Sequence, residues 1–267
     1  MRRPTNRSLP LTALLACLSL SAGLARAESA PSHSGGVDLD LYDRLLERHT
    51  RAVDEVVGTR VDYRAIARSA GWKRLSSQVR AARPSRLDRE GRIAFWINAY
   101  NVLTIDLIVE HYPIASLRDI GSLFFPVWNR EVATIDGRTV SLGEIEHEIL
   151  RKAGEPRIHA AIVCASTSCP PLARRAFRPE RLDADLDDAM RRWLASPDKG
   201  VALDRERNRV RVSEIFDWFE EDFEAQGGVL ATIERFVSTN DAAWLRGAGA
   251  SARIEYLDYD WTLNDDH

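Results

Sequence analysis

Hydrophobic positions along the chain recur mostly at helical spacing, and one segment is apolar nearly all round. Between Ile93 and Ile105 there is no charged residue, within a segment that the pattern predicts to be helical from Asp88 to Tyr112. A helix without a polar face must be buried on all sides, so we expect this one at the centre of the fold. Pro113 is expected to end it, because the residue before a proline avoids helical backbone angles.

Amphipathic helices are predicted on both sides of this central one. Apolar residues recur near helical spacing in 37–57 and in 180–195, and two short helices are expected between 63 and 82. Ser141, followed by Glu144 three positions later, is the capping box that opens a further helix. An aromatic stripe in a helix after position 213 is expected to be core.

Extended segments complete the predicted fold. An Asp-Gly pair predicts a hairpin at 132–140, a second hairpin is expected at 201–212, and a strand at 254–261 closes the chain. A β-branched run through His159 is expected to form another strand, which must stop before Pro170 because proline cannot donate to a β-ladder.

The predicted fold class is therefore α+β. We expect a single, helix-rich globular domain over 38–267, in which helices surround a mixed sheet made of the two hairpins, the His159 strand and the C-terminal strand, with the buried helix at the centre. Residues 28–37 are rich in Ser, Gly and Pro, which predicts a disordered lead-in.

The first 27 residues are predicted to be a signal peptide. They combine a basic start, a short apolar stretch and an Ala-x-Ala cleavage site, which together predict export to the periplasm or secretion after cleavage. Cys17 loosely imitates a lipoprotein cleavage site, but the apolar stretch continues past it, so lipidation is the less favoured alternative. The stretch is too short to be a membrane span.

The charge balance argues against polyanionic partners. The chain has 37 basic and 40 acidic residues; removing the signal peptide takes away four arginines and no acids, so 33 − 40 leaves the mature chain at −7. No basic cluster interleaved with aromatic residues contradicts this, so no nucleic-acid partner is expected. No phosphate-binding glycine loop, HExxH or GxSxG motif is present, and no cofactor is predicted.

The candidate chemistry lies in a small-residue loop that carries Cys164 and Cys169. Three interpretations compete: a disulfide between the two, a nucleophilic thiol, or a soft-metal site that also uses His159. The spacing matches no familiar zinc pattern, so the metal interpretation is the weakest. Cys169, ahead of a helix expected to begin at Pro171, would have its thiolate favoured by the helix N-terminus. Two nearby cysteines in an oxidising compartment are expected to pair.

A base for Cys164 could come from two places. His159 precedes it by five positions, so in a regular strand the two side chains would point to opposite faces. His147 could approach from the preceding helix, with Glu146 or an asparagine orienting it. Glu146 falls close to the apolar stripe of that helix, where the alternative is a structural ion pair with Arg151 or another arginine.

Asn98 and Asn101 lie on one face of the central helix, three positions apart. Buried amides need hydrogen-bond partners, so we favour the interpretation that they bind loop backbone. The alternative is that they line a substrate pocket beside Cys164.

Several separated motifs resemble one known family. They occupy residues 95–101, 145–151, 159–171 and 259–264. In these motifs the chain is similar to the bacterial form of the "domain of unknown function 547" family, over roughly Val61 to Asn264. Because the activity of that family is not established, the resemblance assigns no catalytic residue.

Two functional hypotheses follow. The chain is a thiol-dependent hydrolase or acyl transferase that uses Cys164 on a small molecule or peptide with an amide-like bond. Alternatively, it is a non-catalytic envelope binding module held by a Cys164–Cys169 disulfide.

Overall fold

A long buried helix, α4 (Arg89–His111), lies at the centre of the computed structural model, which describes residues 1, 34–122 and 125–266. The Asp88 carboxylate caps it by accepting the Gly91 N–H at 2.8 Å. Every residue from Ile93 to Ile105 is buried, which confirms the expected central helix. By length and composition α4 could cross a membrane, but 83% of its most apolar window is buried within the protein, as in the core helix of a globular fold.

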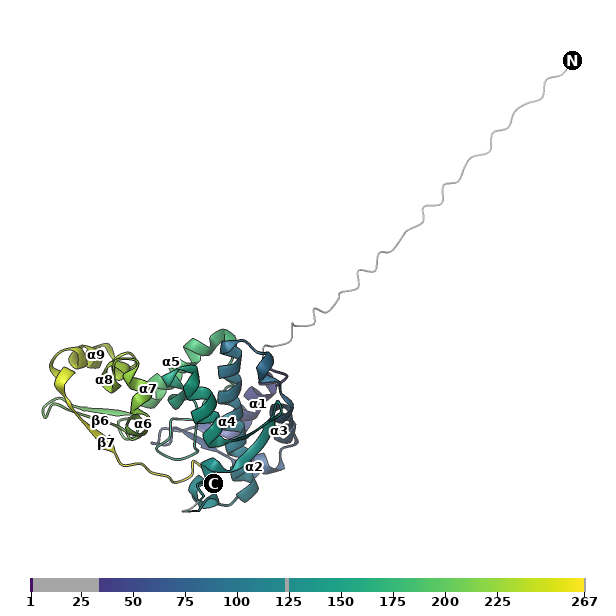
Figure 1. Cartoon of the computed structure of the whole chain (residues 1–267), viewed down its shortest axis with the longest axis horizontal. Coiled ribbons are helices and arrows are strands. Elements are labelled where there is room, and N and C mark those ends of the chain that lie inside the picture. The colour runs from purple at the N-terminus through teal and green to yellow at the C-terminus, as the bar shows by residue number, and fades with distance from the viewer. Residues whose placement is uncertain (2–33, 123–124, 267) are drawn as a thin grey trace. The chain divides into compact units, whose positions relative to one another are not determined.

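Three helices from the first part of the chain lie to one side of α4 (Figure 1). The predicted helix over 37–57 is shorter than expected, because the chain turns into a hairpin at Thr50. These elements are α1 (Leu39–His49), β1 (Thr50–Ala52), β2 (Thr59–Val61), α2 (Tyr63–Arg68) and α3 (Ala70–Ala81). Asp106 of α4 accepts hydrogen bonds from Trp72 at 2.8 Å and Arg80 at 3.0 Å, so a half-buried carboxylate ties α3 to the centre.

The strands form three small sheets and not one. The hairpin predicted at 132–140 turns through Asp136 and Gly137, both with positive φ, as the Asp-Gly pair predicts. The sheets are β1–β2, then β3 (Glu131–Ile135) with β4 (Arg138–Ser141), and β5 (Val201–Asp204) with β6 (Arg209–Ser213) and β7 (Arg253–Leu257). The third sheet is mixed, because β7 pairs parallel to β6. The α+β class is confirmed, but a sheet that joins both hairpins is not formed.

Two local predictions are corrected. The run through His159 is a 3₁₀ helix, Pro156–Ala160, and not a strand. The chain after Pro171 stays irregular through Phe177, so no helix N-terminus acts on Cys169 there. Ser34 and Val37 are buried, so the last residues of the expected lead-in are packed against the fold. The predicted signal peptide, with Cys17, lies outside the described residues, apart from Met1.

Of the remaining α-helices in the described part of the chain, one precedes β5 and four lie between β6 and β7. They are α5 (Leu182–Leu194), α6 (Ile215–Trp218), α7 (Glu220–Glu224), α8 (Val229–Glu234) and α9 (Thr239–Arg246). A π-helical segment, Glu144–Leu150, follows β4, and its start is closed by the predicted capping box: Ser141 N–H donates to Glu144 at 2.9 Å, and Glu144 N–H to Ser141 Oγ at 3.1 Å. This segment places Glu146 and His147 beside α4.

Candidate active site

Cys164 and Cys169 meet at the two ends of a tight loop. Their Sγ atoms are 3.1 Å apart, and Cys164 N–H donates to Cys169 Sγ at 3.0 Å. Ala165, between Cys164 and Ser166, has φ of 62°, a left-handed conformation that is uncommon for a residue with a Cβ. Both cysteines are free thiols, so the disulfide expected from the sequence is not formed in this structure.

Several donors surround the sulfur of Cys164. Ser166 Oγ lies 3.1 Å from it and the Tyr259 hydroxyl 3.4 Å, in addition to the thiol of Cys169. Hydrogen bonding from Cys169, followed by Ser166 and Tyr259, outweighs burial and lowers the pKa of Cys164 to about 6. Burial and the adjacent Cys164 raise the pKa of Cys169. These shifts make Cys164 the more acidic of the two thiols and Cys169 the one that keeps its proton more strongly.

A buried lysine, Lys199, holds the cysteine loop through hydrogen bonds to backbone carbonyl groups. Lys199 is 2% exposed, and its Nζ donates to the carbonyl oxygens of Cys169 at 2.7 Å, Val57 at 2.8 Å and Thr167 at 3.3 Å. Burial lowers the pKa of Lys199 to about 8, although the neighbouring cysteines oppose the shift. All three protons of the ammonium are thus used to fix backbone around the thiol pair.

The C-terminal segment after β7 crosses the other side of the loop. Thr167 N–H donates to the Thr262 carbonyl at 2.8 Å, Ser168 N–H to that of Asp260 at 3.1 Å, and the Asn264 N–H to the carbonyl of Ala165 at 2.9 Å. These bonds set the position of the segment from Tyr259 to Asn264, and this is how the Tyr259 hydroxyl reaches Cys164.

His159 is held by a carboxylate from α7. Its Nε2 lies 2.7 Å from Asp222 Oδ2, and its ring stacks on Phe219 with centroids 4.1 Å apart. Burial lowers the pKa of His159, although Asp222 opposes the shift. For Asp222, burial acts to raise the pKa, but the hydrogen bonds from His159 and Arg151 prevail and bring it to about 2. A neutral imidazole bonded through Nε2 to an ionised carboxylate has Nδ1 left to accept a proton.

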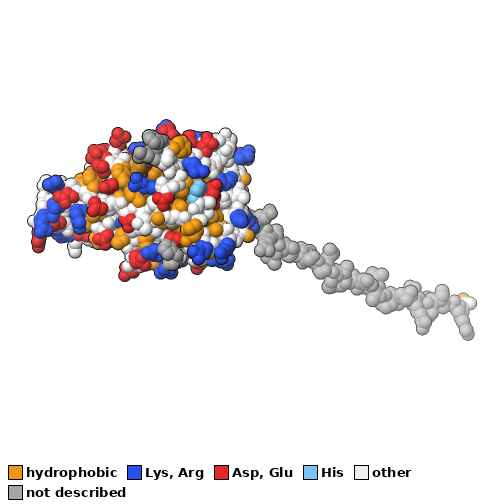
Figure 2. All heavy atoms as spheres, turned by 90° about the horizontal axis from the view of Figure 1, so that it is seen from below, with side chains coloured by type: hydrophobic (Ala, Val, Ile, Leu, Met, Phe, Trp, Pro, Cys, Tyr) orange, Lys and Arg blue, Asp and Glu red, His pale blue; other side chains and the backbone are white. Residues whose placement is uncertain are grey.

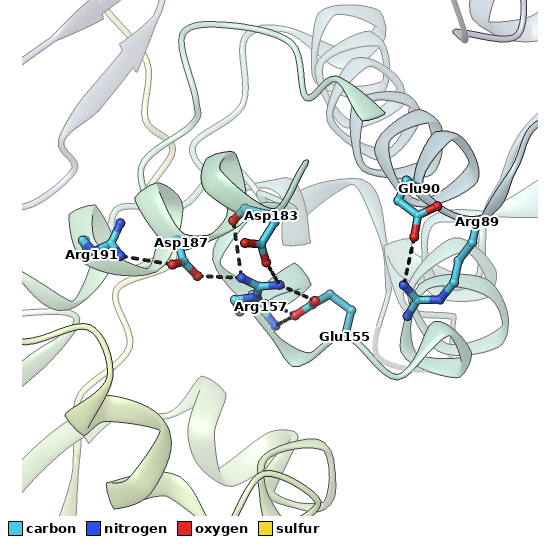
Figure 3. Close-up of polar contacts among 7 residues, drawn as sticks. All are labelled: Arg89, Glu90, Glu155, Arg157, Asp183, Asp187 and Arg191. Carbon is cyan, nitrogen blue, oxygen red and sulfur yellow. Dashed lines mark hydrogen bonds and ion pairs between the residues drawn. The ribbon is translucent and has the colours of Figure 1, made fainter. Parts of the chain in front are cut away.

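The position of His159 depends on the short helix that carries it. Glu155 caps this helix by accepting the Arg157 N–H at 3.1 Å. The Arg157 guanidinium then binds Glu155 at 2.6 Å, Asp183 at 2.8 Å and Asp187 at 2.5 Å, which fastens the helix to α5 (Figure 3). Since the segment is not a strand, the objection that His159 and Cys164 point to opposite faces does not apply.

Glu146 is buried, and no cationic side chain of the described residues forms an ion pair with it. It is 8% exposed, and its hydrogen bond comes from the Tyr100 hydroxyl at 3.4 Å. The expected ion pair with Arg151 is absent from the described residues, because Arg151 binds Asp222 at 2.7 and 3.0 Å and contacts His147 Nδ1 at 3.2 Å. Burial, with a smaller contribution from Cys164, raises the pKa of Glu146 to about 7.

All five predicted catalytic side chains line one cavity of about 270 Å³. They are Cys164, Cys169, Glu146, His147 and His159. No hydrogen bond among the described residues joins either histidine to Cys164, so the predicted direct contact of His147 with the thiol is not seen. The other lining residues are Tyr100, Trp128, Ile162, Ile215, Trp218, Phe219, Tyr259 and Trp261.

Asn98 and Asn101 do not line this cavity. The Asn98 side chain bonds both the carbonyl and the N–H of Phe177, at 2.8 and 2.9 Å. The Asn101 side chain bonds the Ala161 carbonyl and the Val163 N–H, each at 2.9 Å. The alternative that these two amides bind substrate is therefore corrected. Both amides bind loop backbone, which is the interpretation that the sequence favours.

Four residues of the site were not among the candidates. Asp222 and Lys199 give no local signal, since one lies in an acidic helix and the other in a loop. Ser166 and Tyr259 did lie in the motifs quoted for the family resemblance, and only their roles were missing. Trp218 and Phe219, expected to be core, face the cavity instead.

Among the described residues, no group of three or more His, Cys, Asp or Glu side chains is arranged to hold a metal ion. Residues 84–194 match the family described as "Protein of unknown function, DUF547", which confirms the resemblance over that part of the chain. The match includes Glu146, His159 and both cysteines, and it leaves out Asp222 and Tyr259. No curated protein and no solved structure matches the chain.

Proposed function

We propose that this protein is a thiol-dependent hydrolase or acyl transferase in which Cys164 is the nucleophile and His159 is the general base, oriented by Asp222. One observation carries the proposal: the Cys169 thiol and the Ser166 and Tyr259 hydroxyls lie within hydrogen-bond distance of the Cys164 sulfur, in a cavity that also presents a carboxylate-bound histidine. A stabilised thiolate and an oriented imidazole are the parts that acyl transfer through a thioester requires.

The reaction has two steps. The Cys164 thiolate attacks the carbonyl carbon of an ester or amide-like substrate, a carbon–sulfur bond forms, and the leaving group departs and takes a proton from water in the cavity. In the second step, water or another acceptor attacks the thioester while His159 takes its proton. The carbon–sulfur bond then breaks, the thiolate is restored, and His159 returns the proton to solvent.

The side chains around the thiol suit this chemistry. With a pKa of about 6, Cys164 is ionised at neutral pH without help from a base, so His159 is free to act in the second step. The lowered pKa of His159 keeps it neutral and able to accept a proton. Asp222 and the Phe219 ring hold the imidazole in one orientation.

The test is to detect the acyl-enzyme. The protein is mixed with p-nitrophenyl esters, and release of nitrophenol is followed together with the mass of the peptide that contains Cys164. We expect a burst and an acylated Cys164, no labelling in Cys164→Ser, and a burst that persists in His159→Gln with turnover slowed by roughly 100-fold or more. Cys169→Ser, which keeps the nucleophile, is the matched control. An ester that leaves Cys164 unmodified at every pH between 6 and 8 would rule out the proposal.

A second candidate is a binding module held by a Cys164–Cys169 disulfide. It is favoured by the Sγ separation of 3.1 Å, from which a small movement forms the bond. Peptide masses of the native protein without reductant distinguish the two, because a nucleophile must be present as a thiol.

A further inference from the structure

The cavity contains a buried carboxyl group with which no cationic side chain of the described residues pairs. Glu146 is 8% exposed and lines the cavity, with the Tyr100 hydroxyl, at 3.4 Å, as its hydrogen-bond donor. Buried carboxylates in proteins are almost always paired or saturated with hydrogen bonds, because burial of an isolated charge is costly. Cys164, as a thiolate, adds a second negative group to the same space.

The nearest basic side chains are already engaged elsewhere. No arginine or lysine is among the described residues that line the cavity. Arg151 acts on Glu146 only through space, since its guanidinium is bonded to Asp222 at 2.7 and 3.0 Å. The Lys199 ammonium donates its hydrogen bonds to three backbone carbonyl oxygens.

The walls around Glu146 also favour a positive charge. Trp128, Trp218 and Trp261 line the cavity, and their rings contact one another with centroids 5.6 and 5.7 Å apart. The face of an indole ring attracts cations. Trp261 already shows this preference, because the Arg118 guanidinium lies 5.0 Å from its ring centre.

We propose that the cavity selects substrates that carry a protonated primary amine, which pairs with the Glu146 carboxylate while the reacting carbonyl lies against Cys164. The substrate class is thus an ester or amide of an amino acid or short peptide with a free amino group. This inference rests on the proposed function for the reaction, but the binding of the amine does not depend on it.

The first experiment measures binding without catalysis. Iodoacetamide, which is uncharged, alkylates Cys164 in the presence of n-butylammonium, 1-butanol or butyrate. We expect butylammonium at millimolar concentration to slow the alkylation several-fold, and the other two to have little effect. Equal protection by butanol would overturn the proposal, because an apolar cavity alone would explain it.

Glu146→Gln keeps the shape of the side chain and removes its charge. This variant should lose the protection by butylammonium. Glu148→Gln is the control, because Glu148 lies two positions further on, is 51% exposed and pairs with Lys152. Protection that survives in Glu146→Gln would also contradict the proposal. If that variant does not fold, the comparison of butylammonium with butanol on the wild-type protein still decides the question.

The second experiment measures selectivity in the reaction. We compare kcat/KM for the p-nitrophenyl esters of 6-aminohexanoate and of hexanoate, which differ in the amine. The wild-type protein should prefer the amino ester by about tenfold or more, and Glu146→Gln should reduce this ratio towards one. Equal rates for the two esters overturn the inference and leave the proposed function intact. Protection by butylammonium with no acylation by either ester would support the inference that the cavity binds an amine and would overturn the proposed function.

Discussion

At the scale of single residues, the site is a set of donors arranged around one sulfur. The chemical types that the sequence singled out do meet: both cysteines, both histidines and Glu146 line one cavity. Their positions in local motifs made them predictable. Asp222 and Tyr259 were not predictable as partners, because they lie 63 and 95 positions from the residues they bind, and only the folded chain brings them together.

The lowered pKa of Cys164 has a direct kinetic consequence. A thiol reacts as its thiolate, so the alkylation rate of Cys164 should rise as pH increases through about 6 and level off above 7. A thiol of ordinary pKa, about 8.5, is still mostly protonated there. Tyr259→Phe removes one of the donors and should move the midpoint upward by several tenths of a pH unit or more. Rates of iodoacetamide modification between pH 4.5 and 9, read by peptide mass, provide the test; a midpoint near 8.5 in the wild-type protein contradicts it.

Lys199 should be essential to the stability of the loop. Lys199→Met keeps the length of the side chain but leaves two buried carbonyl groups and one part-buried carbonyl group without their donor. The expected loss is about 3 kcal/mol in the free energy of unfolding, measured by urea denaturation. Lys152→Met, at an exposed lysine paired with Glu148, should change it by less than about 0.5 kcal/mol. Equal effects of the two substitutions would show that the loop does not depend on the buried ammonium.

At the scale of elements, the sequence predicted the helices and hairpins better than the segment that carries the site. The central helix and the capping box at Ser141 follow from local rules, and both are confirmed. The segment after Pro156 has the composition of a strand, yet in the described part of the chain it pairs with none of the three sheets. The Asn101 amide from α4 takes up the Ala161 carbonyl and the Val163 N–H that a β-ladder would otherwise use. A side-chain amide that replaces a neighbouring strand in this way leaves no periodic pattern in the sequence.

The short helix that bears His159 depends on Arg157 for its attachment. The Arg157 side chain is 13% exposed and binds three carboxylates, so Arg157→Met should lower the free energy of unfolding by about 2 kcal/mol or more. Turnover should fall as well, because His159 lies two positions further on. Arg191→Met is the control: Arg191 binds Asp187 in the same network (Figure 3) but is 52% exposed, so its loss should cost under about 0.5 kcal/mol. Denaturation curves of the two variants that coincide would contradict this account.

At the scale of the whole molecule, the cavity is assembled from elements far apart along the chain. The π-helical segment supplies Glu146, the short helix His159, α7 the carboxylate behind it, and the C-terminal segment Tyr259 and Trp261. The surface outside carries charges of both signs, and on the face in Figure 2 acidic and basic side chains are interspersed with hydrophobic ones. Selectivity for a charged substrate would therefore arise inside the cavity, where charge is least screened by water.

The crossing of the cysteine loop by residues 260–264 also has a consequence in time. A ribosome completes Cys164 well before it reaches Tyr259, and at ordinary elongation speeds the interval is on the order of 5 to 20 seconds. Throughout that interval the nascent chain lacks the Tyr259 hydroxyl, which is one of the three side-chain groups that lower the pKa of Cys164. Full activation of the proposed nucleophile thus waits for one of the last segments of this sequence to be translated, and a chain released early, after a frameshift or a premature stop codon, would lack the Tyr259 hydroxyl.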